Sequence, residues 1–243
     1  MIFSFFEKKK PLDIKSLKVD LHSHLIPSID DGAKDIDESI SMIKALYSLG
    51  YQKLITTPHI MSDGYKNNAQ IIKDGLGIIK DSLLKEDIDI AIDIAAEYYL
   101  DDGFLDKLSN SELLTIGGRY LLFETSYISK PIKLEDMIFA ISTAEYIPLM
   151  AHPERYRYIK DMKEYHRFKE LGIMFQVNIN SFGGYYGKDA QKKAIYLSKS
   201  GMIDFLGSDI HHIKQIQMLK KVLKSKEYQQ IFENNNILND MLI

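Results

Sequence analysis

The chain has 243 residues, of which 45% are hydrophobic and 27% are charged, and its formal net charge is −3. This length and composition suit one large α/β domain with a sizeable core. The 31 Lys and Arg residues form no dense basic stretch, which argues against nucleic acid as a partner, and the absence of cysteine excludes disulfides, thiolate zinc sites and cysteine nucleophiles.

The amino terminus begins with a short apolar stretch that is followed by three lysines. This stretch is too short for a signal peptide, and its charges follow the apolar residues instead of preceding them. No run in the chain approaches the ~20 apolar residues that a membrane span requires. We therefore expect a frayed or docking tail over residues 1–17, one domain over residues 18–243, and a cytoplasmic protein that is not transmembrane.

Stretches of helical length and pattern alternate with apolar runs of strand length. The first helix is expected over Asp35–Leu49, where apolar residues recur at spacings of three and four before Gly50. Similar stretches are Asn67–Leu84, Leu134–Tyr146, Asp161–Leu171, Asp189–Ser200 and Ile213–Leu223. The alternation predicts βα units with parallel strands, and about seven units without a flexible linker favour a closed or distorted barrel over an open sheet.

No nucleotide-binding motif follows any of the expected strands. The glycine-rich segment Gly183–Gly187 comes after Asn178 but lacks the lysine and hydroxyl residue that end a phosphate-binding loop. This segment is better interpreted as a flexible loop over the mouth of the barrel. Tyr185 and Tyr186 in this loop, together with Tyr156, are candidates to line a cleft for an aromatic substrate.

Seven apolar runs end on a polar residue that, in nearly every case, can bind a metal. The runs are Lys18–His24, Leu54–His59, Ile90–Glu97, Tyr120–Glu124, Ile147–His152, Met174–Asn178 and Phe205–His211. Because the carboxyl ends of barrel strands line one mouth, these side chains are expected to form the ligand set of a metal-dependent enzyme. A single histidine is more often an ordinary core or surface group, but five of the seven histidines lie at these strand ends.

Spacing and burial strengthen the case for a metal centre. Period-two alternation places Asp20, His22 and His24 on one face of the first strand, where the carboxylate can orient an imidazole. Glu97 and Glu124 end runs that are almost free of other charges, and burying either one without a cation or donor would cost several kcal/mol. The Asp30-Asp31-Gly32 stretch, taken alone, is better explained as an ordinary turn.

The motifs, taken together and in order, resemble those of a known superfamily. They are His22-Ser-His24, Asp30-Asp31-Gly32, Thr57-Pro-His59, the strand ends Glu97 and Glu124, Ala151–Arg155 and Ser208–His211. The set is similar to that of the PHP (polymerase and histidinol phosphatase) superfamily, in particular its bacterial protein-tyrosine phosphatases of capsule and exopolysaccharide operons. The resemblance implies a distorted (β/α)7 TIM-like barrel of the PHP type over residues 18–243, a metallophosphatase domain.

The resemblance also implies a role for individual residues and a cofactor of three divalent ions, usually Mn²⁺, although the ligand types also accept iron or zinc. The implied ligands are His22, His24, Glu97 and Asp209 for the first ion, Glu97, Glu124 and His152 for the second, and Asp31, His59 and His211 for the third. Arg155 is implied to bind the phosphate; its alternative is a surface salt bridge with Glu154 or with a charged residue of a helix. Family members often carry an arginine shortly after the last motif, whereas this chain has Lys214, a point charge without the same fork of donors.

The leading hypothesis is a metal-dependent protein-tyrosine phosphatase that acts on the tail of a bacterial tyrosine kinase and thereby controls capsule or exopolysaccharide synthesis. Three divalent ions among four carboxylates leave a net positive charge that matches a phosphate-monoester dianion. We expect metal-activated water, without a covalent phospho-enzyme, to attack phosphorus. The alternatives are a small-molecule phosphomonoesterase, such as a histidinol-phosphatase, and a non-catalytic binding module that metals stabilise.

Overall fold

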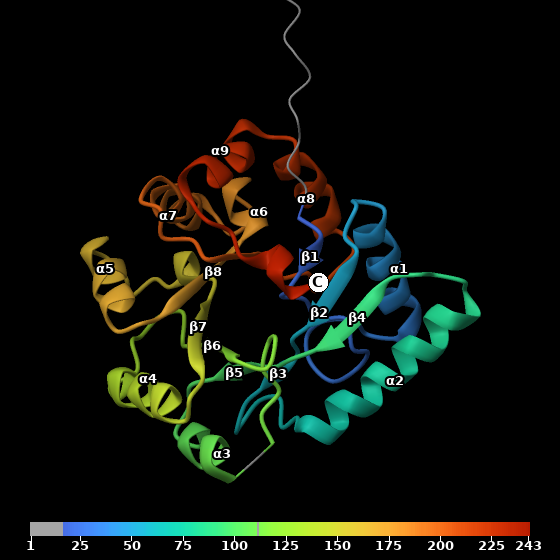
Figure 1. Ribbon diagram of the computed structural model, residues 1–243, viewed down its shortest axis with the longest axis horizontal. Helices are drawn as coiled ribbons and strands as arrows, with labels where there is room; N and C mark the ends of the chain where they lie inside the picture. The colour runs from blue at the N-terminus through green and yellow to red at the C-terminus, as the bar shows by residue number, and fades with distance from the viewer. Residues whose placement is uncertain (1–16, 111) are drawn as a thin grey trace, which may run out of the picture.

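The computed structural model describes residues 17–110 and 112–243. The predicted tail of residues 1–17 therefore lies, apart from Leu17, outside the described residues. The strands are β1 (Val19–Asp20), β2 (Lys53–Thr56), β3 (His59–Ile60), β4 (Ala91–Ile94), β5 (Glu97–Tyr99), β6 (Tyr120–Glu124), β7 (Ile147–Ala151), β8 (Met174–Asn178) and β9 (Phe205–Gly207). They alternate with helices that lie outside them (Figure 1).

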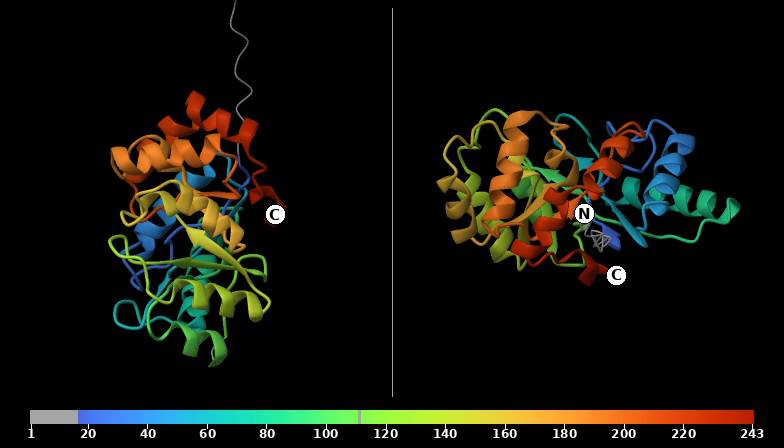
Figure 2. Two further views of the ribbon diagram at one scale, coloured as in Figure 1. Left: turned by 90° about the vertical axis from the view of Figure 1, so that its left-hand side faces the viewer. Right: turned by 90° about the horizontal axis from the view of Figure 1, so that it is seen from above.

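The helices include every one predicted from the sequence, each within two residues of its expected start and somewhat shorter in most cases. They are α1 (Ile36–Tyr47), α2 (Ala69–Lys85), α3 (Phe104–Asn110), α4 (Leu134–Thr143), α5 (Lys163–Glu170), α6 (Ile179–Phe182), α7 (Lys188–Lys199), α8 (Gln215–Leu223) and α9 (Lys226–Asn234), with 3-10 turns η1 (Pro153–Arg155) and η2 (Asn239–Leu242). The longest, α2, projects at one end of the molecule in the view from above (Figure 2, right). Among the described residues, no helix is both long and apolar enough to cross a membrane.

The strands form two parallel sheets, which confirms the predicted α/β class with parallel pairing. One sheet has the order β1-β2-β4, and the other has the order β3-β5-β6-β7-β8-β9. Two of the predicted runs pass from one sheet to the other, because the chain is interrupted between β2 and β3 and again between β4 and β5. Each interruption places a polar residue, His59 or Glu97, at the start of the second segment.

The first and last strand runs also lie side by side. Ser23 and Ile210 form an isolated parallel bridge beyond the ends of β1 and β9. The His24 backbone N–H donates to the Ile210 carbonyl at 3.0 Å, and the Asp209 N–H donates to the His22 carbonyl at 2.8 Å. These hydrogen bonds bring the His22–His24 segment into contact with the Asp209–His211 segment, although the two segments lie far apart in the sequence of the predicted domain.

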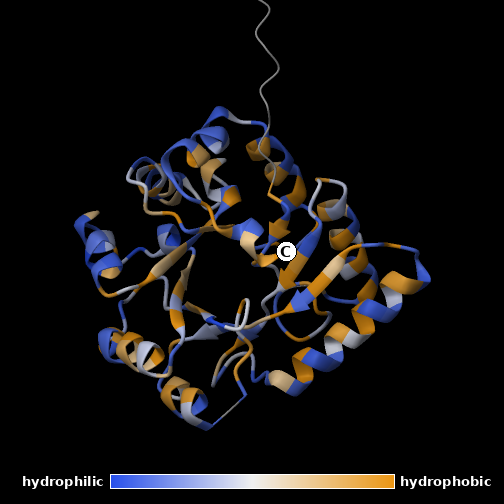
Figure 3. Ribbon diagram, in the orientation of Figure 1, coloured by the Kyte–Doolittle hydropathy of each residue, from blue (hydrophilic) through white to orange (hydrophobic). Residues whose placement is uncertain are grey.

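Alternation along the strands separates two hydrophobic clusters. In β6, Leu121 and Phe123 belong to the larger cluster, which includes the buried faces of the helices, whereas Leu122 belongs to a smaller cluster with Val19 and Leu149. Strands that are buried on both faces in this way are typical of parallel sheets. The helices carry both hydrophobic and hydrophilic residues, as expected for amphipathic elements that cover a sheet (Figure 3).

Side-chain caps set the beginnings of three helices, α1, α2 and α9. The Asp35 carboxylate accepts a hydrogen bond from the Glu38 N–H at the start of α1, and the Asn68 side chain accepts one from Ile71 at the start of α2. The glycine-rich segment forms the turn between α6 and α7, where Gly184 and Gly187 have φ values of 77° and 94°. Only glycine adopts this left-handed region without strain.

Candidate metal centre

Every predicted ligand lies at or just beyond the carboxyl end of a strand run, or in the loop that follows the first one. Seven of these side chains are buried, and the structure brings all nine into overlapping groups whose possible ligand atoms lie within 4.8 Å of one another. The groups are His22, His24 and Asp209; His22, Glu97 and His152; His59, Glu97 and Glu124; and His24, Asp31, His59 and His211. A mixed set of imidazoles and carboxylates at this density is typical of a site for several divalent cations.

Glu97 lies at the centre of the innermost groups and is fully buried. Its Oε2 atom is 3.3 Å from His22 Nε2 and 3.2 Å from His59 Nδ1, while its Oε1 atom is 2.9 Å from His152 Nε2. Burial alone would raise the pKa of Glu97, but the imidazoles of His22 and His59 hold it well below its usual range. Glu97 is therefore ionised and is shared among several imidazoles.

Asp209 is the second buried carboxylate that several ligands share. Its Oδ1 atom lies 3.4 Å from His22 Nε2 and 3.5 Å from His24 Nε2. Its Oδ2 atom faces the other way and accepts hydrogen bonds from Asn178 at 2.6 Å and from Arg155 Nη1 at 2.7 Å. One carboxylate thus joins the imidazole cluster to an arginine.

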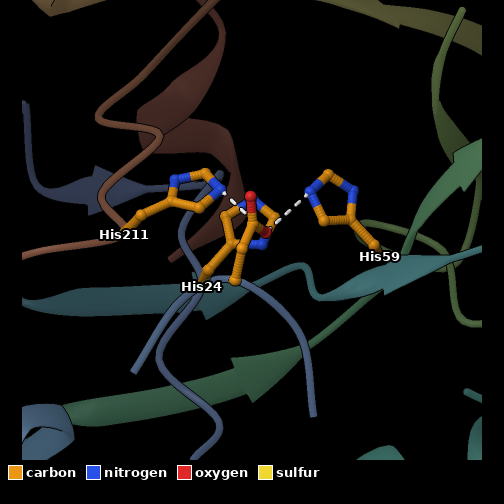
Figure 4. A group of neighbouring side chains, drawn as sticks. His24, His59 and His211 are labelled. Atoms are coloured by element: carbon orange, nitrogen blue, oxygen red, sulfur yellow. Dashed lines mark ion pairs between the residues drawn. The ribbon is translucent and has the colours of Figure 1, made fainter. Parts of the chain in front are cut away.

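The outermost group lies nearest the solvent. Asp31 Oδ1 is 3.3 Å from His59 Nε2 and 3.5 Å from His211 Nε2, and the Asp31 side chain is 53% exposed. The imidazoles of His24, His59 and His211 converge, and the rings of His24 and His211 stack with centroids 3.9 Å apart (Figure 4). Since Asp31 is the most exposed of the nine, this group forms the entrance to the cluster.

Several buried polar atoms in the cluster have no hydrogen-bond partner within the described part of the chain. They include Glu97 Oε2, His59 Nδ1 and His152 Nδ1. Leaving such atoms unsatisfied is costly, and most buried polar atoms in proteins are satisfied. Glu97 Oε2 also has three imidazole nitrogens within 3.6 Å, none of which makes a hydrogen bond to it. This pattern fits bound cations, which would accept lone pairs from the carboxylate and the imidazoles together.

The electrostatics of the imidazoles lead to the same conclusion. Burial would lower the pKa of His24, but Asp30 and Asp209 raise it to about 10. An imidazole must lose its proton to bind a metal, so protons and cations compete for the same nitrogens. Cations bound in this cluster would replace these protons and neutralise the carboxylates that raise the pKa of His24.

Residues that are not predicted ligands orient the imidazoles. His22 Nδ1 lies 2.7 Å from Gln176 Oε1, and His24 Nδ1 lies 2.8 Å from Asp30 Oδ2. Asp30 is thus more than the ordinary turn residue expected from the sequence. Asp20, in contrast, does not orient an imidazole as the sequence suggested. Its carboxylate instead accepts a hydrogen bond from the Ser208 backbone N–H, in the last strand run, at 2.8 Å.

Arg155 lies beside the cluster, in the turn that follows β7. Its guanidinium carbon is 4.7 Å from the Tyr127 ring centroid and 4.2 Å from the Tyr186 ring centroid. The alternative of a salt bridge with Glu154 is wrong. Glu154 is buried and its Oε1 accepts from the Asn178 backbone N–H and the Ser181 hydroxyl, whereas Arg155 pairs with Asp209.

A cavity of about 400 Å³ opens next to Arg155. It is lined by Tyr127, Ile128, Arg155, Arg157 and Tyr186. The prediction that Tyr186 lines a cleft is confirmed, and its hydroxyl also donates to Asp209 Oδ2 at 3.2 Å. The prediction for Tyr156 is wrong, because its side chain is fully buried and its hydroxyl donates to the Ala151 carbonyl. Tyr185 is 44% exposed and does not line the cavity.

Lys214 is exposed and directly precedes α8. Arg155 contacts the cluster through Asp209, and Arg157 lines the cavity next to Arg155. Arg157 was not identified from the sequence, although it stands two residues after Arg155. Its closeness in sequence to Arg155, the implied phosphate-binding residue, is the signal that could have found it.

The fold and the cluster define an α/β protein with a polynuclear cation site at the carboxyl ends of parallel strands. Residues 18–238 match the family described as capsular polysaccharide synthesis, CpsB/CapC, and the chain belongs to this family. The match confirms the resemblance to the capsule-operon branch. It also covers all nine predicted ligands and Arg155.

Individual relatives agree with the family match. The chain is 31% identical over 199 residues to tyrosine-protein phosphatase YwqE of Bacillus subtilis, with 81% of this chain and 78% of the relative covered. It is 24% identical over 243 residues to tyrosine-protein phosphatase CpsB of Streptococcus pneumoniae, covering 93% and 100%. A crystal structure from a study of YwqE and CpsB, described as metal-dependent tyrosine phosphatases, superimposes with a TM-score of 0.78 at 28% identity, covering 90% and 96%.

Proposed function

We propose that this protein is a metal-dependent protein-tyrosine phosphatase. Its substrate would be phosphotyrosine on the tail of a bacterial tyrosine kinase that governs capsule or exopolysaccharide synthesis. The observation that supports this most directly is the position of Asp209, whose two oxygens join the imidazole cluster to Arg155. A phosphate held by Arg155 would therefore lie beside the cations. The cytoplasmic location stays a prediction.

The nine clustered side chains are proposed to hold three divalent ions, with Mn²⁺ as the preferred metal. Such ions, when bound, supply an activated water molecule and neutralise charge on the phosphate. Glu97, at the centre, would be shared between two ions, and Asp31 with His59 and His211 would hold the outermost one. The hydrogen bonds between the first and last strand runs support the further proposal that the fold is a distorted (β/α)7 barrel.

The chain's own residues would bind and orient the substrate. Arg155 presents planar donors that suit two phosphate oxygens, and its stacking between Tyr127 and Tyr186 restricts its orientation. The phenol of tyrosine, with a pKa of about 10, is a better leaving group than an alkyl alcohol and needs less proton donation. This favours an aryl phosphate over an alkyl phosphate such as histidinol phosphate.

The test compares hydrolysis of a phosphotyrosyl peptide and of histidinol phosphate, with Mn²⁺ and with a chelator. We expect chelator-sensitive hydrolysis that favours the phosphotyrosyl peptide. The variants His22→Ala and His24→Ala should abolish it, whereas His166→Ala should retain it because His166 is exposed on α5 and its ring is hydrogen-bonded to Tyr196, which is not a predicted ligand. Circular dichroism would confirm that each variant folds.

Three results would contradict the proposal. A clear preference for histidinol phosphate would identify a small-molecule phosphatase instead. Hydrolysis that survives exhaustive removal of metal would exclude the metal mechanism. Bound metal without any phosphatase activity would favour the non-catalytic binding module. Elemental analysis of the same samples identifies which metals are bound and how many.

A further inference from the structure

The cavity beside Arg155 contains a second arginine that the proposed chemistry does not use. Arg155 and Arg157 are two residues apart, and the intervening Tyr156 has an extended backbone with a fully buried side chain. Arg155 ends the 3-10 turn η1, Arg157 begins the turn that follows Tyr156, and both residues line the cavity. The Arg157 backbone N–H donates to the Tyr127 carbonyl at 2.7 Å, which fixes this segment against the opposite wall.

The two arginines differ in their electrostatic surroundings. Arg155 is 21% exposed and is paired with Asp209. Arg157 is exposed, and within the described residues its side chain makes no ion pair or hydrogen bond. Two other surface cations have partners: Lys130 pairs with Glu164, and Arg167 pairs with Glu135. Arg157 is therefore an unpaired positive charge at the rim of a cavity whose described lining contains no acidic residue.

We propose that Arg157 is a specificity-determining residue that binds the carboxylate of an acidic residue next to the phosphotyrosine. The inference rests on the proposed function and adds the class of peptide that the enzyme prefers. Arg155 lies on the inner side of the cavity, against Asp209 and the cation cluster, whereas Arg157 lies on the exposed side. A peptide whose phosphate reaches Arg155 would therefore have Arg157 within the same cavity, on its exposed side.

The remaining lining residues fit a peptide better than a small phosphate ester. Tyr127 and Tyr186 offer aromatic surface for the phosphotyrosyl ring. Ile128, at 76% exposure, offers apolar surface at the rim for the neighbouring residues of the peptide. A planar guanidinium that has no internal partner suits a carboxylate because it can bind both oxygens with parallel donors.

The experiment uses two phosphotyrosyl peptides that differ only at the residues on either side of the phosphotyrosine, glutamate in one and glutamine in the other. The kcat/KM ratio of the two peptides is measured for the manganese-loaded wild type, Arg157→Gln, Arg157→Lys and the control Arg167→Gln. We expect the wild type to prefer the glutamate peptide by about two- to fivefold, as is usual for an exposed charge pair. The preference should decrease when salt is added, because the pair is screened.

Arg157→Gln should bring this ratio to about one, Arg157→Lys should retain part of the preference, and Arg167→Gln should retain all of it. A wild type that hydrolyses both peptides equally would overturn the inference while leaving the proposed function intact. The same conclusion would follow if a folded Arg157→Gln variant kept the wild-type ratio. If the wild type hydrolysed neither peptide, the proposed function would fail and this inference with it.

Discussion

The side-chain amide of Asn178 donates to Oδ2 of Asp209 at 2.6 Å. The same asparagine accepts from Gln176 Nε2 at 2.9 Å, and Gln176 Oε1 in turn lies 2.7 Å from His22 Nδ1. A chain of two neutral amides on β8 thus joins two predicted ligands that come from the first and last strand runs. Because Gln176 Oε1 accepts the Nδ1 proton of His22, Nε2 is left free to bind a cation.

Removal of the Asn178 amide should weaken metal binding without unfolding the protein. In Asn178→Ala, Asp209 loses a hydrogen bond that restricts its rotation, and the affinity for Mn²⁺ should fall by about 10- to 100-fold, as is usual for a residue that orients a ligand. Isothermal titration with Mn²⁺ measures the change. Asn235→Ala is the control, because Asn235 makes comparable hydrogen bonds to Ser198 and Ile203, away from the cluster. An unchanged affinity in Asn178→Ala would show that Asp209 is held without it.

Bound cations should stabilise the folded protein. The cluster holds a buried carboxylate oxygen and two buried imidazole nitrogens that lack hydrogen-bond partners, and its ligands come from distant parts of the chain, so they meet only in the folded protein. At a Mn²⁺ concentration of 100 times Kd, the gain is about 2.7 kcal/mol, which corresponds to roughly 5–10 °C in Tm for a chain of this size. Differential scanning calorimetry before and after chelation measures it. Glu97→Gln should lose most of this increase in Tm, since the variant lacks the central carboxylate. An increase as large as that of the wild type would contradict the role of Glu97 as a shared ligand.

Arg155→Lys should impair turnover although the positive charge is kept. Lysine has no planar fork for two phosphate oxygens, and it loses the stacked geometry between Tyr127 and Tyr186. We expect kcat/KM for a phosphotyrosyl peptide to fall by about 10- to 100-fold, the effect of one or two lost charge-assisted hydrogen bonds. Steady-state kinetics measure this, with Arg167→Lys as the control. A variant as active as the wild type would show that Arg155 holds Asp209 and does not bind phosphate.

The positions of the predicted ligands could be derived from the sequence because each strand-end ligand follows an apolar run. Parallel strands bring their carboxyl ends to one edge, so residues as distant as His22 and Asp209 must meet there. Asp31 could not be found in this way, because a short acidic turn has the same composition whether or not it faces a cluster. For Asp31 only the resemblance to a family was informative.

The residues that orient the ligands were harder to predict. Gln176 and Asn178 alternate with apolar residues in β8 and are both buried. Two amide side chains that are two residues apart in an apolar strand indicate a polar face inside the fold. Their partners depend on which strands are neighbours, and composition does not determine that. Of the helices that were not predicted, α3 and α6 are short, so their apolar stripes span too few turns to be distinguished from loops. The third, α9, is as long as α8 but buries only Tyr228 and Ile231, which is too little for a clear apolar stripe.

Two glycines of α2 offer a matched test of packing next to the first strand run. A Cβ atom on Gly75 would lie 2.2 Å from Ile26 Cγ2, whereas a Cβ atom on Gly77 would have no atom within 4 Å. Gly75→Ala should therefore lower the free energy of unfolding by about 1–3 kcal/mol, because Ile26 and the loop that carries the predicted ligands must shift. Gly77→Ala should raise it by about 0.5–1 kcal/mol, since alanine favours the helix and restricts the unfolded chain. Urea denaturation measures both, and equal effects would show that α2 does not pack closely on Ile26.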